Sequence, residues 1–290
     1  MSAIDEPQCV FTADAELGEG PVWRSADDAL WFVDIKGLRI HRFEPATGAA
    51  WSWAAPAQPG FIAPVSDGGW IAGLKTGLHR FDPRSGRFEL MTSVEDASLD
   101  NRLNDGFVDG QGRLWFGSMH DGETNLTGAL YRLDGRGLVR CDTGYCITNG
   151  PAVSPDGRTL YHTDTLKKVI YAFDLSPGGD LSNKRVFAKV DEGYPDGPAV
   201  DAEGCIWTGL FAGWHVRRYA PDGKLIEKVR FPVANITKLA FGGDDLKTVY
   251  ATTAWKGLSK AERDAQPLAG GLFSFRVDVA GLPQHEVRHA

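Results

Sequence analysis

Short apolar runs recur along the whole chain, and they come in sets of three. The first run of each set begins with small and polar residues, the second contains an aromatic residue, and the third alternates between apolar and polar positions before a turn. The first runs cover residues 17–23, 61–68, 102–112, 147–157, 194–204 and 235–245. The second runs cover 30–34, 69–73, 114–118, 160–164, 206–210 and 249–253, and the third cover 39–48, 77–86, 129–137, 169–179, 215–223 and 271–281. Runs of this length between Gly, Pro and Asp residues are typical of β-strands.

The sets repeat six times over 290 residues, which gives a diverged repeat of about 48 residues. Each repeat contains three recognisable strands and has room for a fourth. Repeated four-stranded sheets are typical of β-propellers, which have about 4 to 8 blades. The sequence therefore predicts an all-β, six-bladed β-propeller with four-stranded blades, formed by residues 1–290 as a single domain.

A propeller also has to join its last blade to its first. Residues 8–15 (QCVFTADA) precede the first set and have the character of a strand. We expect this N-terminal strand to close the ring as the outer strand of the last blade, because it would cover an exposed sheet edge. The C-terminal residues 285–290 (HEVRHA) are the alternative candidate for that position.

The composition agrees with an all-β protein, since the chain has 35 glycines and 9 tryptophans. One aromatic residue recurs at an equivalent position in every second run. We expect these side chains to pack between sheets rather than to bind a ligand, because large aromatic residues are usually buried. They are Trp31, Trp70, Trp115, Tyr161, Trp207 and Tyr250.

The charge pattern and the cysteines indicate which partners and which cellular location to expect. The net charge is −7 and no Lys/Arg cluster occurs, which argues against nucleic acid as a partner. No apolar run approaches 18 residues and the start lacks a basic region followed by an apolar core, so we expect a cytoplasmic protein without a membrane partner. The four cysteines show no metal-site spacing, and we expect free thiols. We expect a monomer or a weak oligomer that binds a small molecule.

The candidate chemistry lies in the first runs, which are expected to line the central channel. Aligned on the small residue before the apolar part, these runs place a ring of residues at the channel mouth: Glu19, Ile62, Asp105, Asn149, Asp196 and Thr237. Three of them, Glu19, Asn149 and Asp196, precede a Gly-Pro pair. Carboxylates crowded together repel one another, and a divalent cation relieves that repulsion. Oxygen ligands suit Ca²⁺, Mg²⁺ and Mn²⁺, and Zn²⁺ and Fe(II) also accept carboxylates.

The alternative is that these motifs are ordinary turns, because Asn-Gly and Asp-Gly are common turn pairs. Pro-Asp-Gly also occurs at 155–157 and at 221–223, where it separates two strands of one repeat. The copy at 195–197 lies one strand earlier in its repeat, and the hairpin turn there already falls at 201–204. We therefore expect Asp196 to point into the channel.

Several longer stretches resemble a known family. They are LGEGPVW, LWFVDI, NRLNDGFVDGQGRLWFGSM, GALYRLD, TNGPAVSPDGRTLYHTDT, IYAFDL and YPDGPAVDAEGCIWTGLF, in that order. They are similar to the senescence marker protein/gluconolactonase/luciferin-regenerating (regucalcin-like) family, and within it to bacterial aldonolactonases of the xylonolactonase branch.

The resemblance implies a six-bladed propeller with one catalytic divalent metal ion, held by Glu19, Asn149 and Asp196. It also implies that Arg102 and Asn104 bind substrate. In animal members an acidic residue after a Gly-Thr-Met motif contacts sugar hydroxyls. Here the corresponding stretch reads GSMHDGETN, so that Asp121 and Glu123 are both candidates for this contact.

The expected function is metal-dependent hydrolysis of a sugar lactone, which converts an aldonolactone, such as a pentono- or gluconolactone, to the aldonic acid in carbohydrate catabolism. In this scheme Asp196 is both metal ligand and general base. Two alternatives remain: a non-enzymatic calcium-binding or scaffold propeller, and a propeller hydrolase that acts on other esters. Of the nearby histidines, we expect His120 to lie at the rim of the site and His162 to be a hydrogen-bonded core residue.

Overall fold

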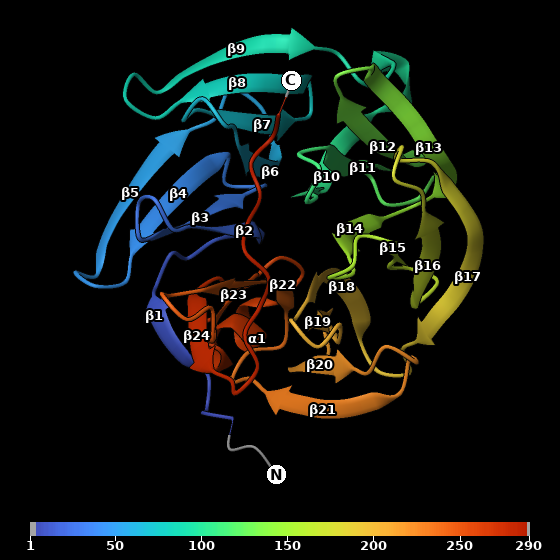
Figure 1. Cartoon of the computed structure of the whole chain (residues 1–290). Coiled ribbons are helices and arrows are strands. Elements are labelled where there is room, and N and C mark those ends of the chain that lie inside the picture. Colours follow the sequence, from blue (N-terminus) through green and yellow to red (C-terminus); the bar gives the residue numbers. More distant parts are fainter. Residues whose placement is uncertain (1–3, 289–290) are drawn as a thin grey trace.

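Six four-stranded antiparallel sheets surround a central channel in the computed structural model, which describes residues 4–288 (Figure 1). Blade 1 contains β2 (Gly18–Arg24), β3 (Ala29–Asp34), β4 (Arg39–Glu44) and β5 (Ala49–Ala54), and blade 2 contains β6 (Pro59–Pro64), β7 (Trp70–Leu74), β8 (Gly77–Asp82) and β9 (Arg87–Thr92). Blade 3 contains β10 (Asn101–Val108), β11 (Leu114–His120), β12 (Gly128–Asp134) and β13 (Gly137–Tyr145), and blade 4 contains β14 (Thr148–Val153), β15 (Thr159–Asp164), β16 (Val169–Leu175) and β17 (Leu181–Lys189). Blade 5 contains β18 (Tyr194–Val200), β19 (Ile206–Phe211), β20 (His215–Tyr219) and β21 (Leu225–Arg230). Blade 6 contains β22 (Ile236–Gly242), β23 (Thr248–Thr253), β24 (Leu272–Arg276) and β1 (Gln8–Phe11). The all-β, six-bladed architecture predicted from the repeats is confirmed.

The N-terminal strand closes the ring. β1 pairs antiparallel with β24, with Gln8 opposite Ser274 and Cys9 opposite Phe273. This confirms the predicted closure and leaves no place for the C-terminal residues in blade 6. They cross the channel instead (Figure 1), with Gly281 bridged to Asp201 of blade 5. We call residues 281–288 the C-terminal strap.

The strap ends on blades 2 and 3. Val287 pairs in parallel with Val65, and Arg288 N–H donates to the carbonyl of Gly112 at 3.0 Å. Val287 is fully buried. The strap therefore covers one end of the channel and leaves the other end for the site.

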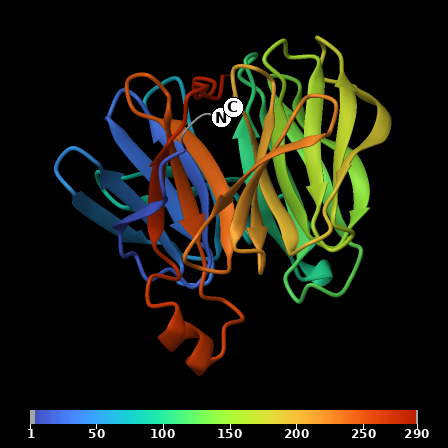
Figure 2. The same ribbon diagram turned by 90° about the horizontal axis from the view of Figure 1, so that it is seen from below.

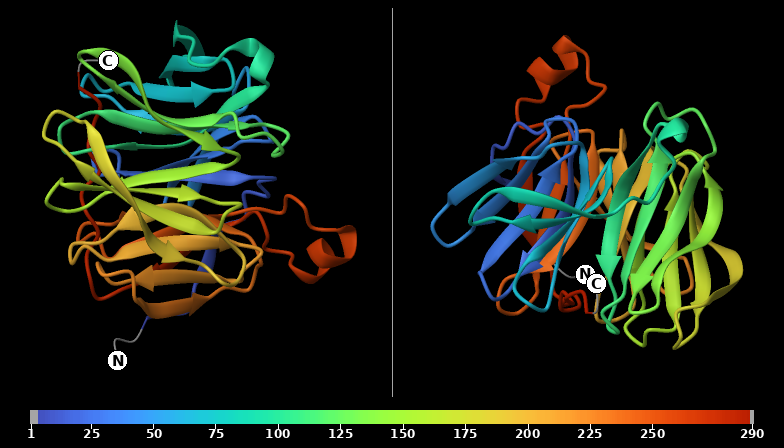
Figure 3. Two further views of the ribbon diagram at one scale, coloured as in Figure 1. Left: turned by 90° about the vertical axis from the view of Figure 1, so that its right-hand side faces the viewer. Right: turned by 90° about the horizontal axis from the view of Figure 1, so that it is seen from above.

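The open end of the channel lies on the face that carries α1 (Lys260–Ala265). Two views at right angles to Figure 1 show this short helix standing away from the blades, on the side opposite to the strap (Figures 2 and 3). The 3₁₀-turn η1 (Ala97–Leu99) lies on the same face (Figure 2). No helix within residues 4–288 is long and apolar enough to span a membrane.

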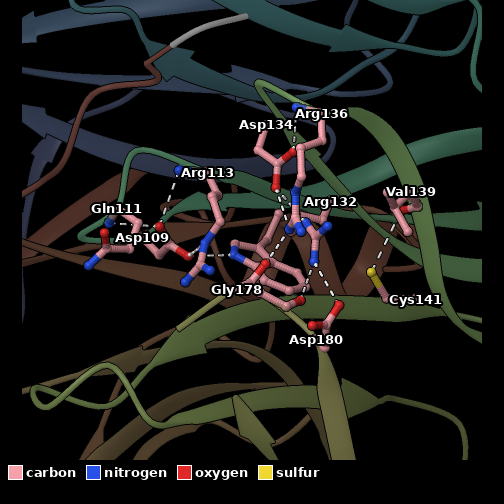
Figure 4. Close-up of polar contacts among 12 residues, drawn as sticks. Asp109, Gln111, Arg113, Arg132, Asp134, Arg136, Val139, Cys141, Gly178 and Asp180 are labelled. Atoms are coloured by element: carbon pink, nitrogen blue, oxygen red, sulfur yellow. Dashed lines mark hydrogen bonds and ion pairs between the residues drawn. The ribbon is translucent and has the colours of Figure 1, made fainter. Parts of the chain in front are cut away.

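The recurrent aromatic residues are buried between blades, as predicted. Trp115 Nε1 also donates to Asp109 at 2.7 Å, and Arg113 reaches the carbonyl of Pro177 in blade 4 at 3.0 Å. Arg132 and Arg136 contact the neighbouring carbonyls of the same blade 4 turn (Figure 4). This polar cluster joins blades 3 and 4, so it is a structural feature of the fold.

Every inner strand carries an irregularity in its pairing with the next strand. The register shifts between Glu19 and Val22 in β2, between Asn149 and Ala152 in β14, and between Pro195 and Pro198 in β18. Bulges of this kind redirect side chains and are common next to active sites. Here they turn equivalent residues of several blades toward the channel.

Candidate active site

A pocket of about 410 Å³ lies at the open end of the channel. All of the predicted site residues except Asp121 line it. Its other lining residues are Leu17, Met119, Ile147, Phe211 and Lys256. The inner strands of blades 1, 3, 4 and 5 thus bring together side chains that are distant in the sequence.

Glu19 and Asp196 face each other in this pocket and are 4% and 5% exposed. Glu19 Oε2 accepts the N–H of Gly20 at 3.0 Å, and Asp196 Oδ1 accepts the N–H of Gly197 at 3.0 Å. The same arrangement occurs in both strands because each bulge turns the next peptide N–H toward the carboxylate. Gly20 has φ +52°, a conformation that favours glycine.

The two carboxyl groups are electrostatically strained. Burial, and then the charge of Asp105, raise the pKa of Glu19 to about 7. Burial, and then the neighbouring Glu19 carboxylate, raise the pKa of Asp196 well above its usual range. A buried pair of carboxylates with raised pKa values is typical of a functional site.

Asn149 is held at the same level of the channel by its neighbours. Its Nδ2 donates to Thr165 Oγ1 at 2.9 Å, and its Oδ1 accepts from Asn104 Nδ2 at 2.9 Å. Thr165 Oγ1 in turn donates to the carbonyl of Pro195 at 3.0 Å, next to Asp196. This chain of hydrogen bonds fixes the orientation of the amide and links blades 3, 4 and 5.

Arg102 is 2% exposed and lies beside Asn104, to whose Oδ1 its Nη1 donates at 2.5 Å. Asp121 lies behind Arg102, with 3.2 Å between Oδ1 and the Arg102 Nε. Lys36 and Lys75 from blades 1 and 2 approach the same carboxylate at 2.8 and 3.0 Å. Burial opposes ionisation of Asp121, but the hydrogen bonds from these lysines outweigh it and hold its pKa below the usual range. The structure therefore places Asp121 outside the pocket lining, as a support for Arg102.

Glu123 occupies the pocket wall and forms an ion pair with Lys256. Lys256 belongs to the segment between β23 and α1, and its N–H donates to the carbonyl of Glu16 at 2.8 Å. The sequence analysis did not identify Lys256, because it lies in no recurring motif.

Asp105 and Lys238 were also not identified as partners. Asp105 belongs to the predicted ring, but its carboxylate points to Lys238 beneath the pocket. Lys238, which follows Thr237 in the sequence, therefore supplies the positive charge that pairs with Asp105. A sequence alignment of the repeats could locate Lys238 but could not show that it faces blade 3 across the channel.

The structure agrees with the expected position of His120 but not with the expected hydrogen bonding of His162. His120 does not line the pocket, and Asn125 Nδ2 lies 3.2 Å from its Nε2 at the surface, which agrees with a rim position. His162 is fully buried, but neither ring nitrogen has a hydrogen-bond partner. The expectation of a hydrogen-bonded His162 is therefore wrong. Its ring packs edge-on against Tyr145, with centroids 4.9 Å apart.

The residues of the pocket fit a divalent cation. Two buried carboxylates and one amide oxygen, from Glu19, Asp196 and Asn149, form a hard oxygen donor set of the kind that such ions prefer. Burial and the neighbouring carboxylates raise the pKa of both acids, and a divalent cation would relieve the cost of ionising them together. Within residues 4–288, no three His, Cys, Asp or Glu side chains gather as metal ligands, so the amide of Asn149 would have to be the third donor.

Comparisons with known proteins show the family to which the chain belongs. Residues 17–255 match the SMP-30/Gluconolactonase/LRE-like region. A 6-deoxy-6-sulfogluconolactonase from Pseudomonas putida is 34% identical, over 96% of this chain and 97% of that protein. An L-arabinolactonase from Azospirillum brasilense is 34% identical, over 95% and 94%. The crystal structure of a calcium-binding regucalcin from Agrobacterium tumefaciens strain C58 has a TM-score of 0.94 at 27% identity and covers 98% of both chains. The chain therefore belongs to the SMP-30/gluconolactonase/LRE-like family, as its motifs predicted.

Proposed function

We propose that this protein hydrolyses sugar lactones in a metal-dependent reaction that converts an aldonolactone to the aldonic acid. The observation that carries the proposal is the convergence of Glu19, Asn149 and Asp196 with Arg102 and Asn104 in one pocket. Relatives named 6-deoxy-6-sulfogluconolactonase and L-arabinolactonase support the reaction class.

Glu19, Asn149 and Asp196 are the residues that would hold the metal ion. A divalent cation bound there supplies Lewis-acid polarisation of the lactone carbonyl and lowers the pKa of a nearby water. The hydrogen bonds of Asn149 with Thr165 and Asn104 fix the orientation of its amide group in the pocket.

Asp196 is the general base in this proposal. Its Oδ1 accepts the Gly197 N–H, which holds the carboxylate in the pocket, where it would take a proton from the attacking water. The water oxygen bonds to the carbonyl carbon, the ring C–O bond breaks, and the proton passes from Asp196 to the departing ring oxygen. The backbone carbonyl of Asp196 accepts a hydrogen bond from the Thr208 hydroxyl at 3.1 Å, which holds the residue in place during these proton transfers.

Arg102 and Asn104 orient the substrate and stabilise the negative charge that develops on the carbonyl oxygen. Arg102 is preorganised for this role by Asp121 behind it, so little reorganisation is needed when charge appears. The ion pair of Glu123 and Lys256 offers an acceptor and a donor for ring hydroxyls at the pocket wall. A polyhydroxylated five- or six-membered lactone, such as a pentono- or gluconolactone, matches this polar lining.

Calcium binding without catalysis is the second candidate, because the similar structure from Agrobacterium tumefaciens is described as a calcium-binding protein. Both candidates use the same metal position. The two functions differ only in whether the metal-bound protein hydrolyses a substrate.

A pH-stat assay over a panel of aldonolactones, simple aryl esters and phosphotriesters tests the proposal. We expect acid release only from aldonolactones, and loss of at least about 10³-fold in kcat for Asp196→Asn, in keeping with removal of an essential base. Asp201→Asn is the matched control, since Asp201 is equally buried but lies at the strap end of β18. If metal-loaded protein hydrolysed none of the lactones, the result would favour the calcium-binding function. Preference for the aryl esters or phosphotriesters would favour a propeller hydrolase that acts on other esters.

A further inference from the structure

A buried ion pair lies in the channel between the pocket and the C-terminal strap, and the proposed reaction does not use it. Lys238 Nζ contacts Asp105 Oδ1 and donates to the carbonyl of Gly106 at 3.1 Å. The side chains of Lys238 and Asp105 are 7% and 0% exposed. Lys238 also lines the apolar part of the channel together with Leu282 and Pro283 of the strap, so water has little access to the pair.

The pair touches the strands that carry two of the candidate metal ligands. Asp105 Oδ2 accepts the N–H of Gly150, the residue after Asn149, at 2.7 Å. A Cβ atom on Gly197, the residue after Asp196, would lie 2.6 Å from Asp105 Oδ2 and 2.8 Å from the Lys238 side chain. The pair therefore packs directly against the peptides that follow Asn149 and Asp196, and glycine at 197 makes this approach possible.

The charge of the pair also reaches the carboxylates above it. Asp105 packs against the peptides that follow Asn149 and Asp196, so its charge acts at short range on the oxygen atoms proposed to hold the metal ion. When all four groups are ionised, the carboxylates of Glu19, Asp105 and Asp196 carry −3 and the Lys238 ammonium carries +1, which sums to −2.

The other charged side chains that line the pocket are Arg102, Glu123 and Lys256, and each has an ion-pair partner. Arg102 pairs with Asp121, and Lys256 pairs with Glu123. The site layer thus carries the charge that one divalent cation neutralises.

We propose that the Asp105–Lys238 ion pair sets the net charge beneath the metal position and thereby tunes the affinity of the site for a divalent cation. The inference rests on the proposed function, since it concerns the same metal position. Lys238 acts as a positioning and charge-balancing residue: it neutralises part of the acidic layer without touching the metal ion or the substrate.

Titration of Mn²⁺ into metal-free protein, followed by calorimetry and by the electron paramagnetic resonance signal of free Mn²⁺, tests this inference. Asp105→Asn leaves the Lys238 ammonium unbalanced and is expected to weaken Mn²⁺ binding by at least about tenfold. Lys238→Met removes a positive charge from the layer and is expected to tighten binding by about threefold or more. The double variant restores the net charge and is expected to lie within about threefold of the wild type.

A merely structural role predicts a different pattern, because both single substitutions would then weaken binding and the double variant would not recover it. Asp201→Asn is the matched control: it breaks the buried ion pair with Arg218 at the other end of β18 and is expected to lower stability without changing the dissociation constant for Mn²⁺. Lys238→Gln provides a second neutral replacement if the methionine variant does not fold.

If the dissociation constant for Mn²⁺ rises in Asp105→Asn and falls in Lys238→Met, the result supports the inference. Changes of the same sign in both variants, or no change in either, would overturn it. Absence of Mn²⁺ binding by the wild-type protein would overturn the metal-dependent function itself, which separates the two failures.

Discussion

Replacement of Glu19 by glutamine is expected to stabilise the metal-free protein at alkaline pH. In the wild type, folding buries Glu19 and brings it near the Asp105 charge, which raises the pKa of Glu19 from 4.5 to about 7. Below pH 4.5 the group is protonated in both the folded and unfolded states, so the burial of its charge costs nothing. As the pH rises from 4.5 to 7, the unfolded chain loses the proton first, and the free energy of unfolding falls.

The magnitude follows from the same pKa values. At ~1.4 kcal/mol per pH unit, the difference between 4.5 and about 7 corresponds to about 3 kcal/mol at pH 8 and to less than about 1 kcal/mol at pH 5. Glutamine keeps an oxygen that can accept the Gly20 N–H, so the substitution removes the charge and little else.

Urea unfolding of chelated protein at pH 5 and pH 8 measures this effect. We expect Glu19→Gln to exceed the wild type by about 3 kcal/mol at pH 8 and to be close to it at pH 5. Glu89→Gln, on the exposed face of β9, is the control and should show no such gain. With a saturating divalent cation the order at pH 8 should reverse, because only the wild type gains the full binding free energy. A wild type that is already as stable as Glu19→Gln without metal would refute the reasoning.

Three further predictions concern other parts of the molecule. Deletion of residues 1–15 removes β1 and exposes the edge of β24, so we expect loss of the cooperative melting transition, and an unchanged melting curve would contradict the closure. Asp121→Asn should raise KM for the lactone and reduce kcat at least about tenfold, because it frees Arg102 from its ion pair, and unchanged steady-state constants would show that Arg102 needs no such support. Burial lowers the pKa of His162 to about 3, below the value of 6.5 in the unfolded chain, so its contribution to stability is lost as the pH falls below about 6.5. From pH 7 to pH 5, His162→Phe should therefore lose about 2 kcal/mol less unfolding free energy than the wild type, and parallel pH profiles would argue against a buried neutral histidine.

The strand repeat was sufficient to predict the architecture, because each blade requires the same alternation of apolar and polar positions. The Gly-Pro pairs after Glu19, Asn149 and Asp196 were also visible in the sequence, and the structure places these residues around one pocket. Their roles as ligands and base remain predictions.

Contacts across the channel could not be predicted in the same way. Lys256 pairs with Glu123 of another blade, and Lys238 pairs with Asp105 of another blade. The two residues of each pair are 133 positions apart in the sequence. Such contacts depend on how far each bulge rotates its strand, which the pattern of hydrophobic residues does not encode. The path of the C-terminal strap across the channel was missed for a similar reason, since Val287 pairs with a single residue outside any regular strand.

The central claim is that Glu19, Asn149 and Asp196 hold one divalent cation that lactone hydrolysis requires. Stepwise addition of Mn²⁺ or Ca²⁺ to chelated protein, with bound metal and lactone turnover measured on the same samples, tests it most directly. We expect no turnover in chelated protein and turnover that rises in proportion to metal occupancy up to one ion per chain, with neither response in Asp196→Asn. Full lactone turnover by chelated protein that binds no metal would contradict the account.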